Sequence, residues 1–196
     1  MRMALPVLLL LLIATPGSAL GADWNPDAAV AGKLAAGAVF AEVKPDPGGA
    51  SGVVHGAVDI TAPQAVVWDT IRDCSRAGRM APGVRACHVT DTGPGGRWDV
   101  RELTVRWSPL TPSFSTVFRS DYDPPGRIRF RCTGGDVACR GQWRLEPLPG
   151  GRTRVIYENR ATSPFDLPAV VTRAAMRRDV ARALVALRRE SEGRGR

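Results

Sequence analysis

The chain has 196 residues, and its 27 lysines and arginines exceed its 19 aspartates and glutamates, which gives a formal net charge of +8. Hydrophobic residues make up 44% of the sequence and charged residues 23%. These values exclude a disordered chain, a collagen-like chain and a coiled coil, and the length predicts a single domain.

The first 21 residues have the pattern of a secretory signal peptide. Arg2 provides a short basic start, residues 7–13 are apolar, and small or turn-forming residues follow. Cleavage after Ala19 or Gly21 would place small residues where a signal peptidase reads them. An uncleaved anchor is the alternative, although a bilayer span takes about 20 apolar residues. We therefore predict a signal peptide over 1–21 and a protein secreted across the inner membrane into the periplasm.

Because disulfides form in oxidising compartments, the predicted export indicates that the four cysteines form disulfides. Four cysteines allow three pairings, and we predict bonds between sequence neighbours, Cys74–Cys87 and Cys132–Cys139. A zinc site is the alternative, but the cysteine spacings match no CxxC pattern and the chain has only two histidines. We predict no metal and no cofactor.

Residues 22–50 are predicted to form an N-terminal helix and strand segment. Asp27 can cap an alanine-rich helix over 28–36. A strand is expected over 38–43, and a second strand over 53–61 can complete a hairpin with it.

The main domain is predicted to span 51–190. Its first helix opens at Ala62-Pro63, where the missing N–H of proline does no harm, and ends near Asp73. Short strands separated by glycine and proline turns follow, which predicts an antiparallel meander. The expected strands are 84–90, 98–107, 113–120, 127–132, 140–146 and 153–161.

Several of these strands alternate between apolar and polar residues. Ile128, Phe130 and Cys132 share one face, and the arginines between them share the other. This alternation predicts a sheet with one apolar face and one wet face. Cys132 and Cys139 fall on the apolar parity of adjoining strands, so a disulfide across that hairpin is geometrically reasonable.

A long amphipathic helix is predicted over about 166–190, and the tail 191–196 is predicted to be disordered. The apolar stripe of the helix must be buried against another element, and the apolar sheet face is the large surface available for it. A curved sheet around one helix leaves a gap in which hydrophobic ligands can bind. The stripe consists of Ala169, Thr172, Met176, Val180, Ala183, Leu184 and Leu187.

The order of these elements resembles the START/polyketide-cyclase superfamily over roughly residues 37–190, most closely its coenzyme-Q-binding START-type branch. The resemblance implies an α+β helix-grip fold, in which a curved antiparallel sheet wraps around a long C-terminal helix. The local matches are residues 60–63 with 67–73, then 80–84, 141–147 and 151–157.

Aromatic, aliphatic, methionine and arginine side chains are predicted to line the ligand cavity, although a packed core is the alternative for the aromatic residues. Arg101 shares the parity of Leu103, so a buried guanidinium there would need a carboxylate or an acidic ligand head group. A surface Arg101 paired with glutamate is the alternative. The loop over 108–116 and the start of the last helix are expected to form the cavity mouth. The predicted lining residues are Trp68, Met80, Arg101, Leu103, Val105, Trp107, Phe118, Phe130, Trp143, Tyr157, Arg173, Met176 and Val180.

The sequence contains no recognised hydrolase, phosphate-binding or zinc-protease motif, and neither His55 nor His88 has an obvious partner, so no catalytic residue is predicted. We expect a binding protein for a lipid or a quinone-like molecule. A polyketide cyclase or aromatase is the alternative enzyme, and an envelope interaction protein with a closed core is a third possibility.

The excess of arginine also bears on which partners the protein can bind. Export and the lack of a nucleic-acid motif argue against nucleic acid. We expect a monomer whose basic last helix makes weak contact with an anionic membrane surface.

Overall fold

The computed structural model describes residues 23–48, 51–81, 83–106 and 111–195. Its strands form one antiparallel eight-stranded sheet in the order β1-β2-β8-β7-β6-β5-β4-β3. Strands β3 to β8 are a meander, and β2 joins the first hairpin to that meander by pairing with β8. The strands are β1 (Val39–Lys44), β2 (Gly52–Ile60), β3 (Val84–Thr92), β4 (Trp98–Val105), β5 (Phe114–Asp123), β6 (Arg127–Gly135), β7 (Cys139–Leu148) and β8 (Arg152–Ala161).

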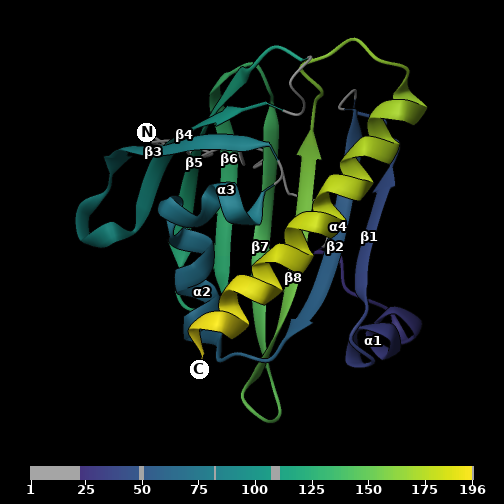
Figure 1. Cartoon of the computed structure of the whole chain (residues 1–196), viewed down its shortest axis with the longest axis vertical. Coiled ribbons are helices and arrows are strands. Elements are labelled where there is room, and N and C mark those ends of the chain that lie inside the picture. The colour runs from purple at the N-terminus through teal and green to yellow at the C-terminus, as the bar shows by residue number, and fades with distance from the viewer. Residues whose placement is uncertain (1–22, 49–50, 82, 107–110, 196) are drawn as a thin grey trace, which may run out of the picture.

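The longest helix, α4, lies diagonally across the concave face of the curved sheet (Figure 1). It contacts β1 and β2 on one side and α2 and α3 on the other. The α-helices are α1 (Ala28–Ala35), α2 (Gln64–Arg72), α3 (Ala77–Met80) and α4 (Ala169–Arg194), and the 3-10 turns are η1 (Cys74–Arg76) and η2 (Pro94–Gly96). This architecture is the predicted α+β helix-grip fold, which the structure confirms.

A glycine on β2 allows α4 to lie close to the sheet. A Cβ atom built on Gly56 would be 2.9 Å from Leu184 Cδ1 and 3.1 Å from Val180 Cγ1, closer than real Cβ contacts normally are. A larger residue would therefore push α4 outward.

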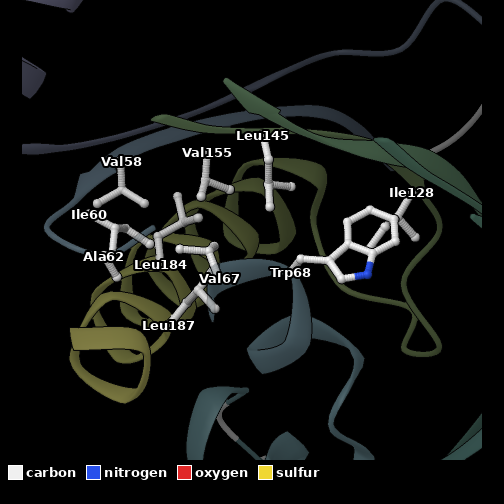
Figure 2. Packing of buried hydrophobic residues seen from close by; sticks show 10 residues of the cluster. All are labelled: Val58, Ile60, Ala62, Val67, Trp68, Ile128, Leu145, Val155, Leu184 and Leu187. Atoms are coloured by element: carbon white, nitrogen blue, oxygen red, sulfur yellow. The ribbon is translucent and has the colours of Figure 1, made fainter. Parts of the chain in front are cut away.

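The main hydrophobic core fills one end of the space between sheet and helix (Figure 2). Side chains from the sheet meet those of α2 and the C-terminal half of α4 there, and burial of this apolar area is the main force that holds the layers together. The core consists of Val58, Ile60, Ala62, Val67, Trp68, Ile128, Leu145, Val155, Leu184 and Leu187.

The structure corrects both predicted ends of the last helix. The helix begins after Pro168, which occupies the N-cap position. Residues 191–195, predicted to belong to a disordered tail, continue the helix through Arg194. Ser191 is fully buried, and the Glu192 carboxylate accepts a hydrogen bond of 3.0 Å from the backbone N–H of Thr61. These contacts hold the last turn against the loop before α2.

The structure contains both predicted disulfides. Cys74–Cys87 connects η1 to β3 with a Cα separation of 5.6 Å, and Cys132–Cys139 connects β6 to β7 with a separation of 4.9 Å. Local chain closure explains the second bond, because the two residues face each other across a hairpin.

The alternation of residues predicted a solvent-exposed convex face, but in the structure part of this face is covered. Helix α1 packs on β1 and β2, and it buries Leu34 completely. Ile156 and Ala57, which pair across β8 and β2, are also fully buried. A small second core therefore covers this part of the outer surface.

The segment before α1, residues 23–27, extends that cover over polar side chains. The indole of Trp24 stacks on His55 at 4.9 Å and on Phe40 at 5.5 Å between ring centroids. Arg144 donates to the backbone carbonyl of Trp24 and to the side chain of Asn25. As a result Arg144 is buried, although its parity on β7 faces away from the helix.

None of the helices in the described ranges is long and apolar enough to cross a membrane. The predicted signal peptide, residues 1–21, lies outside the described residues.

Candidate ligand-binding cavity

A cavity of about 430 Å³ lies between the concave face of the sheet, helices α2 and α3, and α4. This volume is within the range of small-molecule sites, about 300 to 1,000 Å³. Most of its lining is apolar or aromatic, because alternate residues of β4 to β8 point toward α4. The core of Figure 2 borders the cavity, and Ile128, Leu184 and Leu187 belong to both.

The structure places most of the predicted lining residues on the cavity wall. Those residues are Met80, Arg101, Leu103, Phe118, Phe130, Trp143, Tyr157, Met176 and Val180. The sheet residues among them share the inward parity that the sequence alternation indicated, and the two α4 residues lie on the predicted stripe.

Three predicted residues are not on the wall, and one cannot be placed. Trp68 belongs to the packed core, where its ring meets the edge of Tyr122 at 5.9 Å. Val105 is buried at the end of β4. Arg173 lies beside Gly52 of β2, since a Cβ there would be 3.7 Å from its Cγ atom. Trp107 and residues 108–110 of the predicted mouth loop lie outside the described residues.

A continuous aromatic surface forms the sheet side of the cavity. The ring centroids of Phe118 and Phe130 are 6.5 Å apart, those of Phe130 and Tyr157 6.0 Å, and those of Trp143 and Tyr157 4.3 Å. These residues come from four neighbouring strands. Burial raises the pKa of Tyr157 strongly, so its phenol stays protonated at neutral pH.

The α4 side of the cavity is lined mainly by aliphatic side chains, which are smaller than the aromatic rings opposite them. Met176, Val180 and Ala183 follow one stripe of the helix and face the aromatic surface. The side walls include Cys87 and Cys139, one cysteine from each disulfide. Both bridges therefore stiffen segments that carry cavity residues.

Arg101 is buried, with 7% of its surface exposed, and it is fully engaged by protein groups. Its Nε atom lies 3.1 Å from both carboxylate oxygens of Asp99, and Nη2 lies 2.8 Å from Asp99 Oδ2. Nη2 also donates to the Tyr122 hydroxyl at 2.9 Å and to the backbone carbonyl of Arg72 at 2.8 Å. The predicted carboxylate partner is therefore Asp99, and not a glutamate on the surface.

The same cluster fixes the protonation of its members. Burial works against the charge of Arg101, but the hydrogen bonds and charge of Asp99 outweigh it, and the pKa of Arg101 is raised. Burial raises the pKa of Tyr122, whose hydroxyl donates to Asp99 Oδ2 at 2.6 Å. Arg101 and Tyr122 therefore stay protonated near neutral pH and can donate hydrogen bonds.

Sequence reasoning missed several polar residues of the wall. Ser120 and Tyr122 have the same parity as Phe118 on β5. Ser120 lies within the predicted strand 113–120, and extending that strand by two residues would have included Tyr122. Asn159 lies within the predicted strand 153–161 and shares the parity of Tyr157, whereas Arg72 gave no such signal, because it ends a helix.

Among the described residues, no group of three or more histidines, cysteines, aspartates or glutamates is arranged to hold a metal ion. The mainly apolar and aromatic lining suits an organic molecule with a large apolar surface and few polar groups.

A helix-grip fold that encloses an apolar cavity defines a class of small-molecule binding proteins and enzymes. Residues 51–192 match the model of the polyketide cyclase / dehydrase and lipid transport family. The chain belongs to this family.

Solved structures with the same fold come from both branches of that description. A STAR-related lipid transfer protein from Xanthomonas axonopodis is 17% identical, with coverage of 78% of this chain and 93% of that chain and a TM-score of 0.66. Human StAR-related lipid transfer protein 5 is 13% identical, with coverage of 81% and 84% and a TM-score of 0.66. The Zhui aromatase/cyclase from a Streptomyces species is 21% identical, with coverage of 73% and 92% and a TM-score of 0.57. A comparison with curated protein sequences finds no match.

Proposed function

We propose that this protein is exported and binds a hydrophobic or amphipathic small molecule, such as a lipid or a quinone, in the cavity between its sheet and α4. The observation that carries the proposal is the cavity itself, about 430 Å³ of mainly apolar space inside a domain that otherwise has a packed core. A concave, mainly apolar site of this size is the usual form of a small-molecule binding site.

The ligand class follows from the wall. Aromatic rings on one side and aliphatic side chains on the other favour a ligand with an extended apolar body. Burial of that body would contribute roughly 25 cal/mol of binding free energy per Å² of apolar surface removed from water. Arg72, Arg101 and Tyr122 form a connected polar group on the wall, so the polar end of an amphipathic ligand belongs there. A quinone of the coenzyme-Q type is one member of this class.

Binding of the apolar dye Nile red to the full chain tests this function. We expect one dye molecule per protein with a strong rise in fluorescence. Ala183→Trp places an indole in the cavity and should abolish the signal, while Ala174→Trp changes an exposed position of the same helix and should leave it intact. Equal binding by both variants, or none by the unchanged protein, would contradict the proposal.

A polyketide cyclase or aromatase is the alternative function. The observation in its favour is the presence of proton-bearing groups, Tyr122 and Tyr157, on the cavity wall. The raised pKa of each phenol leaves it a proton donor, and the carboxylate on the described wall, Asp179, is paired with Arg178 at 3.2 Å. Loss of turnover with retained dye binding in Tyr157→Phe would favour the enzyme.

We also propose weak docking of α4 on an anionic membrane. Val170 and Val171, which begin the helix, are 72% and 52% exposed. Arg177, Arg178 and Arg182 are exposed further along the same helix. Valines in the interface and arginines near anionic head groups would each contribute to binding.

Co-sedimentation with vesicles tests this docking. The protein should pellet with vesicles that contain phosphatidylglycerol and remain in solution with pure phosphatidylcholine. Val170→Asp should weaken the binding severalfold, whereas Val89→Asp, an exposed valine of β3, should not. Equal loss in both variants would contradict an α4 contact.

Export is tested by the mass of the protein expressed with its own leader. Processing as predicted gives a mature chain that starts at Leu20 or Ala22. An unprocessed chain in the cytoplasm with free thiols would contradict the proposal.

A further inference from the structure

The polar end of the cavity contains two arginines, Arg72 and Arg101, whose surroundings differ. The charge of Arg101 is cancelled by Asp99 at 2.8 Å. The Arg101 guanidinium also donates hydrogen bonds to the backbone carbonyls of Ile71 and Arg72, which end helix α2. Without these bonds, the two carbonyls would attract another nearby cation.

Arg72 has no carboxylate partner within 4.0 Å among the described residues. Asp73, the next residue, pairs with Arg76 at 3.0 Å and Arg194 at 3.5 Å instead. The Nε atom of Arg72 is buried and has no hydrogen-bond partner in the described part of the chain. Buried polar atoms of this kind are rare in folded proteins and call for an explanation.

The guanidinium of Arg72 rests on aromatic rings. Its Cζ atom lies 4.3 Å from the ring centroid of Tyr122 and 5.9 Å from that of Trp68. The Tyr122 hydroxyl also acts as a hydrogen-bond partner of Arg72, but a neutral phenol and aromatic ring faces do not supply the counter-charge that an anion would. Two cations, Arg72 and Arg101, therefore lie on the cavity wall, and the one described carboxylate that pairs with either of them is Asp99, which pairs with Arg101.

We propose that Arg72 receives the anionic oxygen group of the ligand. This inference rests on the proposed function and narrows it: the ligand is an acidic amphiphile with an apolar body along Phe118, Phe130 and Trp143. Carboxylate and phosphate share the required chemistry, since both accept charge-assisted hydrogen bonds from a guanidinium.

The acidic side chain on the opposite wall does not conflict with this assignment. Asp179 of α4 also lines the cavity, but its carboxylate pairs with Arg178 at 3.2 Å. Tyr122 and Ser120, which lie on the sheet side with Arg72, are neutral.

Calorimetric titration at a mildly alkaline pH tests the proposal with three ligands of equal chain length: dodecanol, dodecanoate and dodecyl phosphate. The full chain should bind one or both anions about tenfold more tightly than the alcohol, the effect of one charge-assisted hydrogen bond. Whichever anion binds more tightly identifies the group as carboxylate or phosphate.

Arg72→Met keeps the aliphatic stem and should remove the preference for the anion, while the alcohol binds as before. Arg72→Lys keeps the charge and should retain part of the preference. Arg129→Gln removes an exposed arginine of the convex face and should change nothing. Folding of each variant is verified by its unfolding transition.

Equal affinity of the unchanged protein for anion and alcohol would overturn the assignment of Arg72 while the binding function stands. A preference for the anion that persists in Arg72→Met would overturn it as well. Failure of all three ligands to bind would contradict the proposed function itself.

Discussion

A buried guanidinium is tolerated in this protein because Asp99, Tyr122 and the end of α2 together satisfy it. The sequence left two positions open for Arg101: a buried one with a carboxylate or an acidic ligand head group, and a surface one beside a glutamate. The structure shows the buried position, with Asp99 as the carboxylate partner. The partner is two residues away on the same strand, with the same parity, so it was available in the sequence. Tyr122, from the next strand, was not predicted, because strand register cannot be read from one sequence.

Asp99→Asn should be strongly destabilising, because it leaves a buried guanidinium without its counter-charge. Breaking one side of a buried pair costs about 3 to 5 kcal/mol. The measurement is the free energy of unfolding in urea. Asp121→Asn is the control: Asp121 pairs with Arg119 at 2.8 Å in a more exposed position, where about 1 kcal/mol or less is expected. Equal costs would contradict the structural role of Asp99.

Among the elements, the sequence predicted the eight strands and the alternating faces of several of them, because hydrophobic period and glycine or proline turns are local signals. It did not predict the cover over the convex face. The contacts that hold residues 23–25 there connect positions more than 100 residues apart, such as Asp23 and Arg127. Ile156, an exception to the alternation, was the one sign of that cover.

The contacts that hold the N-terminal segment, residues 23–27, on the sheet should weaken at acid pH. The hydrogen bond from Gln142 and the charge of Arg127 lower the pKa of Asp23 below its ordinary value of 3.8. A lowered pKa means that Asp23 stabilises the fold above that value, and that this contribution is lost as the pH falls through the lower pKa of the folded state.

Thermal unfolding between about pH 6 and about pH 3 measures this effect. Asp23→Asn should unfold at a lower temperature near neutral pH, and its stability should depend less on pH than that of the unchanged protein. Asp69→Asn, at an exposed position of α2, should follow the unchanged protein. Identical pH profiles for all three proteins would show that Asp23 contributes nothing.

The Cys74–Cys87 bond fixes α3, which supplies Ala77 and Met80 to the cavity wall. It closes a loop with a sequence separation of 13, for which chain entropy predicts about 3 kcal/mol. Replacing both cysteines with serine should lower the free energy of unfolding by about that amount and weaken Nile red binding. Unchanged stability and binding would contradict a role of this bond in the site.

At the scale of the whole molecule, the packed core and the cavity share one enclosure. The C-terminal half of α4 closes one end with Leu184 and Leu187, and its middle faces the aromatic wall across open space. The sequence predicted the enclosure through the apolar stripe and the alternating strands. It could not predict whether the side chains fill the space, since that depends on distances such as the approach of α4 at Gly56.

Native mass spectrometry of the full chain, purified under gentle conditions from the cells that express it, tests whether the cavity holds a ligand. We expect a bound apolar or acidic amphipathic molecule at one per chain, which is absent from Ala183→Trp purified in the same way and present in Ala174→Trp. A protein that is ligand-free in all preparations and takes up neither Nile red nor dodecanoate would contradict it.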